Sequence, residues 1–204
     1  MRRLVVLVGV IVLVDTILYS ALAPILPALS DEFSLSKSES GVLVGAYAAG
    51  TLVGALPAGW LIARLGARAV LVGGLLTMTA TGLWFAMASA HWSLDASRFA
   101  QGLGGAATWT AGLAWLAQVA PREKRGQILG TVIGAGIFGA QFGPVVGGIA
   151  ESVGRGPTFA VLALPFIYLP TKTNLKLPKW FFYLFYPAHL AALYAAQQFL
   201  ARGA

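Results

Sequence analysis

The sequence predicts an all-α polytopic membrane protein, and three observations support this fold class. Of the 204 residues, 58% are hydrophobic and only 10% are charged, whereas a soluble domain has about 25% charged residues. Long apolar runs recur, and several approach the roughly 20 residues that a helix needs to cross a bilayer. Lys and Arg fall in the short segments between these runs, as is typical of membrane proteins. The net charge of +7 therefore does not indicate a nucleic-acid partner.

Five of the runs predict long transmembrane helices. They cover about residues 4–26, 41–63, 69–90, 94–119 and 128–150, with a polar loop at 31–40. A sixth run, 157–170, would span only about 21 Å, less than the hydrocarbon core of about 30 Å. We still predict a crossing there, because the lysine-rich loop after it should be cytoplasmic. A seventh helix, 180–200, begins with the aromatic cluster WFFYLFY, which suits the membrane interface.

The charged residues between the helices predict the orientation in the membrane. One side of the predicted membrane holds Arg2, Arg3, Arg64, Arg68, Arg122, Lys124 and Arg125. The other side holds most of the acidic residues, which are Asp31, Glu32, Glu39, Asp95 and Glu151, with Lys37 and Arg155 as basic exceptions. By the positive-inside rule, we expect the N-terminus to be cytoplasmic.

The N-terminal run and the cysteine and histidine content each answer one further question. The start of the chain, MRR and an apolar run up to Ala21-Leu22-Ala23, is similar to a signal peptide. Asp15 inside the run and Pro24 just after it argue against cleavage, so we expect this run to remain as the first helix.

The chain has no cysteine and only two histidines, which are far apart in sequence. We therefore predict no disulfide, no metal site and no cofactor.

Asp15, in the middle of the first predicted helix, is the first candidate for a functional side chain. A carboxylate near the bilayer centre costs at least about 2.5 kcal/mol on insertion scales, so its presence is a hypothesis of function. A buried carboxyl group can gain and lose a proton near physiological pH. Tyr19 lies one turn away on the same face. The alternative is a hydrogen bond between helices with no role in transport.

Arg98 is the second candidate, about one turn into the fourth predicted helix. Gln101, Gly105, Thr108 and Gly112 continue its face at helical spacing. This polar stripe of small residues predicts that the helix lines a cavity. The alternative is that Arg98 extends toward the outer headgroups beside Asp95. Asp15 and Arg98 are predicted at different depths, so an ion pair between them does not follow.

Small residues recur every four positions in two of the predicted helices. These rows are Gly50, Gly54 and Ala58 in the second helix, and Gly139, Gly143 and Gly147 in the fifth. Such rows let helix backbones approach closely in lipid, where packing drives association. Any tight helical bundle uses them, so alone they predict close packing and not a function.

Four motifs together carry a resemblance to a known family. VDTILYSALAPILPAL resembles helix 1 of the drug/proton antiporter branch of the major facilitator superfamily, where an acidic residue precedes P-x-x-P. GWLIARLGAR resembles the signature loop G-x-x-x-D-R-x-G-R-R, and SRFAQGLGGA resembles the helix-4 motif R-x-x-Q-G-x-G. FGAQFGPVVGG matches the helix-5 antiporter motif G-x-x-x-G-P-x-x-G-G at every fixed position. The signature loop retains Gly59, Arg64, Gly66 and Arg68, and the antiporter motif is Gly139, Gly143, Pro144, Gly147 and Gly148.

The order and spacing of the four motifs imply that residues 1–163 resemble the N-terminal six-helix half of such a transporter, built from two three-helix repeats. The chain departs from the family at two points. Ala63 replaces the acidic residue of the signature loop and Ala67 replaces one of its basic residues, which affects the charged network that steadies a gate in the family. The family also has a second six-helix half, and its substrate path lies between the halves.

The last 40 or so residues resemble a different family. LPKWFFYLFYPAHLAALY is similar to the last helix of the TraX family of membrane proteins, which is linked to pilin N-acetylation. The resemblance predicts a division into 1–163, a major-facilitator half, and 164–204, a TraX-like helix and tail. In that family a membrane histidine can matter, so His189 is a candidate, although a hydrogen-bonded histidine in a packed helix is the simpler interpretation.

The resemblance implies a transporter and not an enzyme. We expect proton-coupled efflux of small, amphipathic or cationic molecules. Asp15 would carry the proton or bind a cation, and Arg98 and Gln101 would line the cavity and bias the protonation of Asp15. Activity would need a second half, from a homodimer or a complementary chain, in the bacterial inner (plasma) membrane. Two alternatives remain: an inactive membrane fragment or chimera with a structural role, and a TraX-like membrane acyltransferase.

Overall fold

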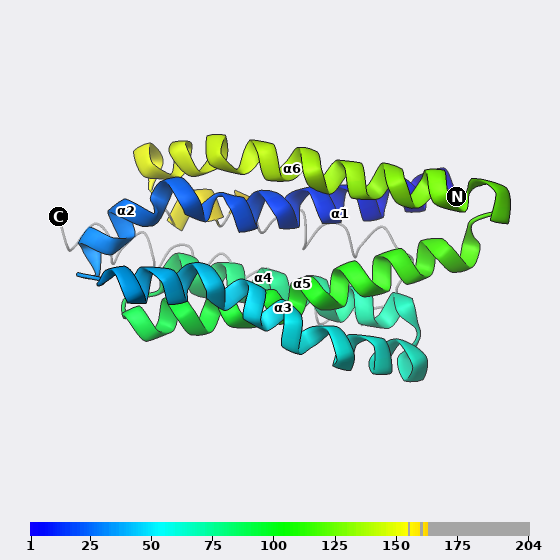
Figure 1. Cartoon of the computed structure of the whole chain (residues 1–204), viewed down its shortest axis with the longest axis horizontal. Coiled ribbons are helices and arrows are strands. Elements are labelled where there is room, and N and C mark those ends of the chain that lie inside the picture. The colour runs from blue at the N-terminus through cyan, green and yellow to red at the C-terminus, as the bar shows by residue number, and fades with distance from the viewer. Residues whose placement is uncertain (155, 160, 163–204) are drawn as a thin grey trace, which may run out of the picture.

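The computed structural model describes residues 1–154, 156–159 and 161–162. Within these ranges it is a bundle of long helices that lie side by side along one axis (Figure 1). In chain order, the elements are α1 (Arg2–Ser20), α2 (Leu22–Glu32), α3 (Lys37–Leu65), α4 (Ala67–Met87), α5 (His91–Val119), the 3-10 turn η1 (Arg122–Lys124) and α6 (Arg125–Val153). Short helical stretches follow at 156–159 and 161–162.

The five long helices that the sequence predicts are all present, but the first differs in detail. It is divided at Ala21 into α1 and α2, and α2 continues to Glu32. Pro24 has no N–H to donate to the carbonyl of Ser20, which interrupts the helical hydrogen bonding at this joint. The predicted polar loop at 31–40 was therefore too long, because helix occupies both of its ends.

Part of the predicted organisation falls outside the described residues. Only the start of the predicted helix at 157–170 is described, and Phe159 there packs against Phe85 of α4 with ring centroids 4.9 Å apart. The predicted helix at 180–200, the domain boundary after residue 163 and His189 lie outside the described residues.

The start of α3 is fixed by a capping box. The Ser36 hydroxyl accepts a hydrogen bond from the Glu39 amide, and the Glu39 carboxylate accepts one from the Ser36 amide. We expect Ser36→Ala to lower the free energy of unfolding by about 1 kcal/mol, because an amide of the first turn loses its acceptor. Denaturant titration followed by circular dichroism measures this, with exposed Ser38→Ala as the control. An equal loss in both variants would contradict the capping role.

Four helical stretches of the described chain are long and apolar enough to cross a membrane. They are Arg2–Glu32, Lys37–Leu65, Ala67–Met87 and Arg122–Val153. The remaining long helix, α5, has 29 residues but buries a polar face that includes Ser97, Arg98, Gln101 and Thr108. At about 1.5 Å per residue, α5 is also long enough to span the hydrocarbon core of about 30 Å. Its lower hydropathy reflects that buried polar face.

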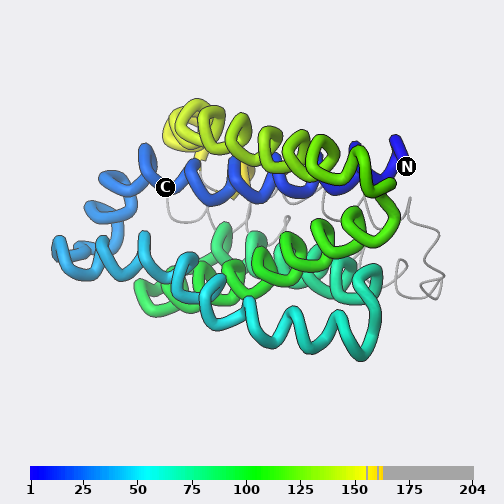
Figure 2. The backbone as a smooth tube through the Cα atoms, turned by 45° about the vertical axis from the view of Figure 1, so that its right-hand side comes forward, coloured from blue at the N-terminus to red at the C-terminus, as the bar shows by residue number. Residues whose placement is uncertain are grey.

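The helices form two closely packed groups. In one, α6 packs along α1 and α2; in the other, α5 packs between α3 and α4 (Figures 1 and 2). Contacts between the groups are fewer at the backbone level. The interface between the two groups is filled by larger apolar side chains from α1, α2 and α4, for example Leu18, Ile25, Leu75 and Met78. The polar residues of the candidate site also lie at this interface.

Glycines explain the close approach within each group. A Cβ at Gly50 of α3 would overlap the carbonyl oxygen of Phe99 in α5, and a Cβ at Gly102 of α5 would overlap that of Tyr47 in α3. On the other side, a Cβ at Gly139 of α6 would overlap the carbonyl oxygen of Leu13 in α1. The two rows of small residues therefore lie at helix contacts, as the sequence predicts.

Charged side chains are segregated along the bundle axis. The N-terminus, the α3–α4 junction and the α5–α6 junction lie at one end of the bundle (Figure 1), and they carry the basic residues predicted to share one side. The opposite end contains the α2–α3 and α4–α5 junctions, with Asp31, Glu39 and Asp95. There, His91 Nε2 lies 3.0 Å from Asp95 Oδ2 and its Nδ1 lies 3.8 Å from Glu39 Oε1.

Candidate functional site

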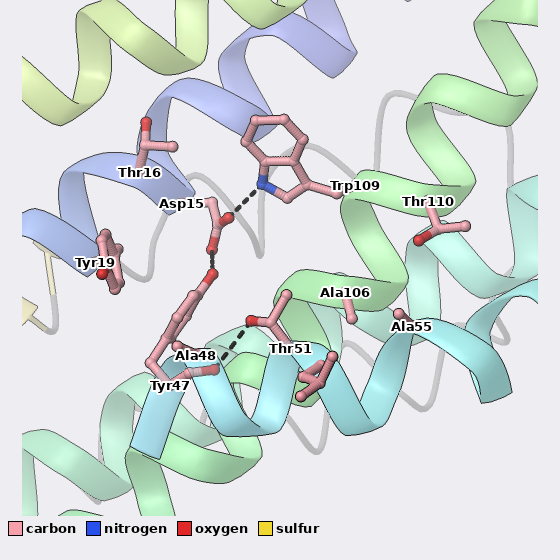
Figure 3. A pocket seen from close by; sticks show the side chains of 11 residues that line it. Asp15, Thr16, Tyr19, Tyr47, Ala48, Thr51, Ala55, Ala106, Trp109 and Thr110 are labelled. Atoms are coloured by element: carbon pink, nitrogen blue, oxygen red, sulfur yellow. Dashed lines mark hydrogen bonds between the residues drawn. The ribbon is translucent and has the colours of Figure 1, made fainter. Parts of the chain in front are cut away.

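Asp15 lies at the interface between the two helix groups, and its side chain is 1% exposed. Both of its carboxylate oxygens accept hydrogen bonds from aromatic side chains (Figure 3). The Tyr47 hydroxyl of α3 lies 2.7 Å from Oδ1, and the Trp109 indole nitrogen of α5 lies 2.6 Å from Oδ2. A buried polar group needs such partners, because an unpaired one costs several kcal/mol in the bilayer. Asp15 therefore connects three helices through one carboxylate.

A cavity of about 560 Å³ opens beside this carboxylate. Its walls come from α1, α3 and α5, and they are mainly aromatic and small apolar side chains. The lining residues are Asp15, Thr16, Tyr19, Tyr47, Ala48, Thr51, Leu52, Ala55, Ala106, Trp109 and Thr110 (Figure 3). A cavity of this size, apolar with a single acidic group, has the character of a small-molecule site.

Tyr19 is 42% exposed and borders this cavity together with Asp15. Its ring lies 5.0 Å from the ring of Tyr47, measured between centroids, at an interplanar angle of 46°. Tilted aromatic pairs of this kind are favourable beyond the area that they bury. The two predicted pathway residues of the first helix are thus brought together on the cavity wall.

Arg98 is fully buried and does not extend toward the end of the bundle. Its Nη1 donates to Gln101 Oε1 at 2.6 Å and to the carbonyl of Leu18 at 3.4 Å, and its Nη2 donates to the carbonyl of Tyr19 at 3.4 Å. The guanidinium also lies 5.1 Å from the ring centroid of Tyr47. Among the described residues, no carboxylate forms an ion pair with Arg98. The arginine thus holds the last turn of α1, just before the joint at Ala21.

The other residues of the predicted stripe on α5 lie beside the cavity and not on its wall. Gln101 is fully buried and pairs with Arg98. The Thr108 hydroxyl donates to the carbonyl of Gly105 at 2.9 Å, and its methyl group faces Gly74 of α4. Gly105 itself makes room for the site, because a Cβ there would overlap the Tyr47 hydroxyl.

The residues of the signature loop lie at the junction of α3 and α4. Gly66 connects the two helices with φ of 83°, in the left-handed region that favours glycine. Arg64 is exposed and its guanidinium lies 4.3 Å from the ring centroid of Trp60. Gly59 is exposed and Arg68 is half-buried near the start of α4.

The antiporter-motif residues of α6 lie along two faces of one continuous helix. Gly139, Gly143 and Gly147 are buried against α1 and the α1–α2 joint. Pro144 and Gly148 are exposed on the other face, with nothing within 4 Å of a Cβ built at Gly148. One motif thus combines three positions of close packing with two that face away from the described helices.

Tyr47 and Trp109 are the site residues that the sequence interpretation missed. Both sit in apolar stretches of their helices, where an aromatic residue most often packs in a core. Two facts of position were visible in the sequence: Tyr47 lies three residues before Gly50, and Trp109 is the neighbour of Thr108 in the predicted stripe. Neither fact predicts a partner, because hydrogen bonds between helices depend on the crossing of α1, α3 and α5.

Comparison with known proteins gives an independent result. The model of the Major Facilitator Superfamily matches residues 8–197. The MFS-type transporter ppzB of Metarhizium rileyi is 29% identical over 176 residues, covering 79% of this chain and 36% of the relative. Probable vesicular acetylcholine transporter-B of Danio rerio is 34% identical over 172 residues, covering 79% and 35%. Tetracycline resistance protein, class E, of Escherichia coli is 34% identical over 156 residues, covering 74% and 38%.

The chain thus spans a little over one third of the length of these curated relatives. The family model, in contrast, covers most of the chain. The bundle of helices formed by residues 1–154 and its apolar spans agree with that match. The chain belongs to the major facilitator superfamily.

Proposed function

We propose that this chain forms one helical bundle of a proton-coupled transporter, in the drug/proton antiporter branch, that exports small molecules across a membrane. The observation that carries the proposal is the buried Asp15 carboxylate on the wall of an accessible cavity. An ionisable side chain at this depth is costly, and such groups mark proton relays and substrate pathways in membrane proteins. The charge segregation along the bundle supports a cytoplasmic N-terminus.

The lining of the cavity supports a cationic, amphipathic substrate. Three aromatic residues, Tyr19, Tyr47 and Trp109, surround the single acidic side chain of the wall. Aromatic faces attract cations, and a carboxylate provides the balancing charge. One relative is named for tetracycline resistance and another for vesicular acetylcholine transport, which supports small organic molecules as the class to test. In exchange, Asp15 would release or take up a proton.

A second bundle would complete the substrate path. Transporters of this family alternate access by moving one half against the other around a site near the midplane. We propose that a second copy of this chain or a complementary chain supplies that half. The mass of the protein in detergent distinguishes this from an inactive fragment: a dimer supports the proposal, and a strict monomer that transports nothing favours a structural role.

We expect Asp15→Asn to abolish proton-driven transport while leaving the protein folded. The purified chain would be placed in vesicles, and accumulation of ethidium or tetracycline would be followed after a proton gradient is imposed. Asparagine has nearly the same size but cannot take up a proton, so proton-coupled transport should fall by about 10² or more, the typical contribution of a proton-transfer group. Exposed Asp31→Asn, at the end of α2, is the control and should leave transport unchanged.

Two results would contradict the proposed function. If the wild-type protein transports equally well without a proton gradient, transport is not coupled to protons. Equal activity of Asp15→Asn and Asp31→Asn would remove the role of Asp15. Circular dichroism on both variants confirms that a loss of transport is not a loss of the fold.

A further inference from the structure

We propose that Tyr47 and Trp109 are positioning residues whose hydrogen bonds favour the ionised form of Asp15 in this conformation and thereby contribute to the pH at which it takes up a proton. This inference rests on the proposed proton role of Asp15. It assigns the control of Asp15 protonation to one residue of α3 and one of α5. The two aromatic residues come from neighbouring helices and reach opposite oxygens of the same carboxylate (Figure 3).

The direction of the hydrogen bonds carries the first step. The Trp109 indole nitrogen can only donate, so its 2.6 Å contact with Oδ2 requires that oxygen to accept. The Tyr47 hydroxyl also donates to Oδ1 at 2.7 Å. Hydrogen bonds donated to a carboxylate favour its charged form over the neutral acid. Two such donors therefore oppose protonation while this arrangement persists.

Few other groups near Asp15 could favour the charged form of its carboxyl group. The titratable and charged groups nearby are Tyr19 on its own helix, Tyr47 on α3 and Arg98 on α5. Ionisable side chains of α6 are confined to its ends, at Arg125 and Glu151. With no ion pair to Asp15 among the described residues, the two aromatic donors are its direct partners.

Both donors are held firmly by their neighbours. The Tyr47 hydroxyl fits against Gly105, where a Cβ would overlap it. The Trp109 indole lies over Gly136 of α6, where a Cβ would be 3.1 Å from Cη2. It also packs against an apolar cluster that includes Val12 of α1 and Val132 of α6. The donors are thus placed before any proton arrives, which is what a positioning role requires.

The same contacts connect the proton to the cavity. A protonated Asp15 keeps one carbonyl oxygen to accept, while its O–H becomes a donor that the indole N–H cannot accept. Tyr47 can rotate its hydroxyl and accept this proton, but Trp109 cannot reverse its bond. With the proton on Oδ1, Tyr47 accepts from the O–H and Oδ2 still accepts from Trp109, although a neutral acceptor binds more weakly than a carboxylate. Since Tyr47 and Trp109 both line the cavity, proton uptake would change the hydrogen bonding of its wall without breaking it. This gives a local route by which protonation alters the cavity.

The test is a pH titration of Asp15 in the 204-residue chain in lipid vesicles. Infrared difference spectroscopy follows the C=O stretch of a protonated carboxyl group, and the Asp15 signal is the part that Asp15→Asn lacks. We expect Tyr47→Phe and Trp109→Phe each to move the midpoint of that signal about one unit to higher pH, from the loss of one charge-assisted hydrogen bond. Trp115→Phe, in the same helix and packed against the apolar core, is the control and should not move it.

The outcomes separate this inference from the proposed function. Unshifted midpoints in both variants, or an equal shift in Trp115→Phe, would overturn the positioning role even if transport is proton-coupled. Shifted midpoints in a protein whose transport ignores the proton gradient would support the positioning role and contradict the proposed function. A wild-type spectrum in which no carboxyl signal depends on Asp15 would overturn both.

Discussion

Gly147→Ala is expected to destabilise the protein severely, whereas the same change at the next residue, Gly148→Ala, is expected to be harmless. A Cβ at position 147 would overlap the carbonyl oxygen of Ala21 and the ring of Pro24. These atoms belong to the α1–α2 joint, where backbone and a proline ring cannot move aside as a flexible side chain would. A Cβ at position 148 meets nothing within 4 Å.

Inserting a methyl group into a well-packed contact typically costs 1–3 kcal/mol, and we expect about 3 kcal/mol for Gly147→Ala. Gly148→Ala should be neutral or slightly stabilising, because alanine is the better helix former by about 1 kcal/mol. Denaturant titration in detergent, followed by circular dichroism, measures both. Equal stability of the two variants would show that α6 does not approach the α1–α2 joint as closely as the structure indicates.

This pair of glycines also shows what the sequence could predict. The fixed positions of the antiporter motif were visible in the sequence, and so was the expectation that its glycines permit close packing. The motif gives Gly147 and Gly148 equal weight, yet only Gly147 contacts α1 and α2. Which glycine is buried depends on the rotation of α6 about its axis, and its exposed face is as apolar as the buried one.

The candidate site was predicted in part for a similar reason. Asp15 stood out in the sequence because a carboxylate is rare in an apolar run, and Arg98 stood out because a cation is rare inside a helix bundle. Their partners Tyr47 and Trp109 did not stand out, since aromatic residues are common in apolar helices. The predicted polar stripe on α5 assumed that polar side chains face a cavity. In the structure, Arg98 instead turns toward backbone carbonyls of α1.

Arg98→Ala is expected to have an effect at least as large as Gly147→Ala. The side chain is fully buried, and it provides donors to Gln101 and to the carbonyls of Leu18 and Tyr19. Its removal leaves a cavity and a buried Gln101 oxygen without its donor, so we expect a loss of about 3–5 kcal/mol in the free energy of unfolding. The control is Arg64→Ala, an exposed arginine stacked on Trp60, for which we expect no more than about 1 kcal/mol.

A second substitution separates the packing of Arg98 from its hydrogen bonds. Methionine has a similar length and is apolar, so Arg98→Met should restore much of the lost packing but none of the donors. If Arg98 holds α1 through the Leu18 and Tyr19 carbonyls, amide hydrogen exchange near the α1–α2 joint should rise in both Arg98→Ala and Arg98→Met. Exchange that rises in Arg98→Ala alone would show that the arginine acts as a space-filling side chain. The joint would then depend on the contacts of α6 with Ala21 and Pro24, which the Gly147→Ala variant tests separately.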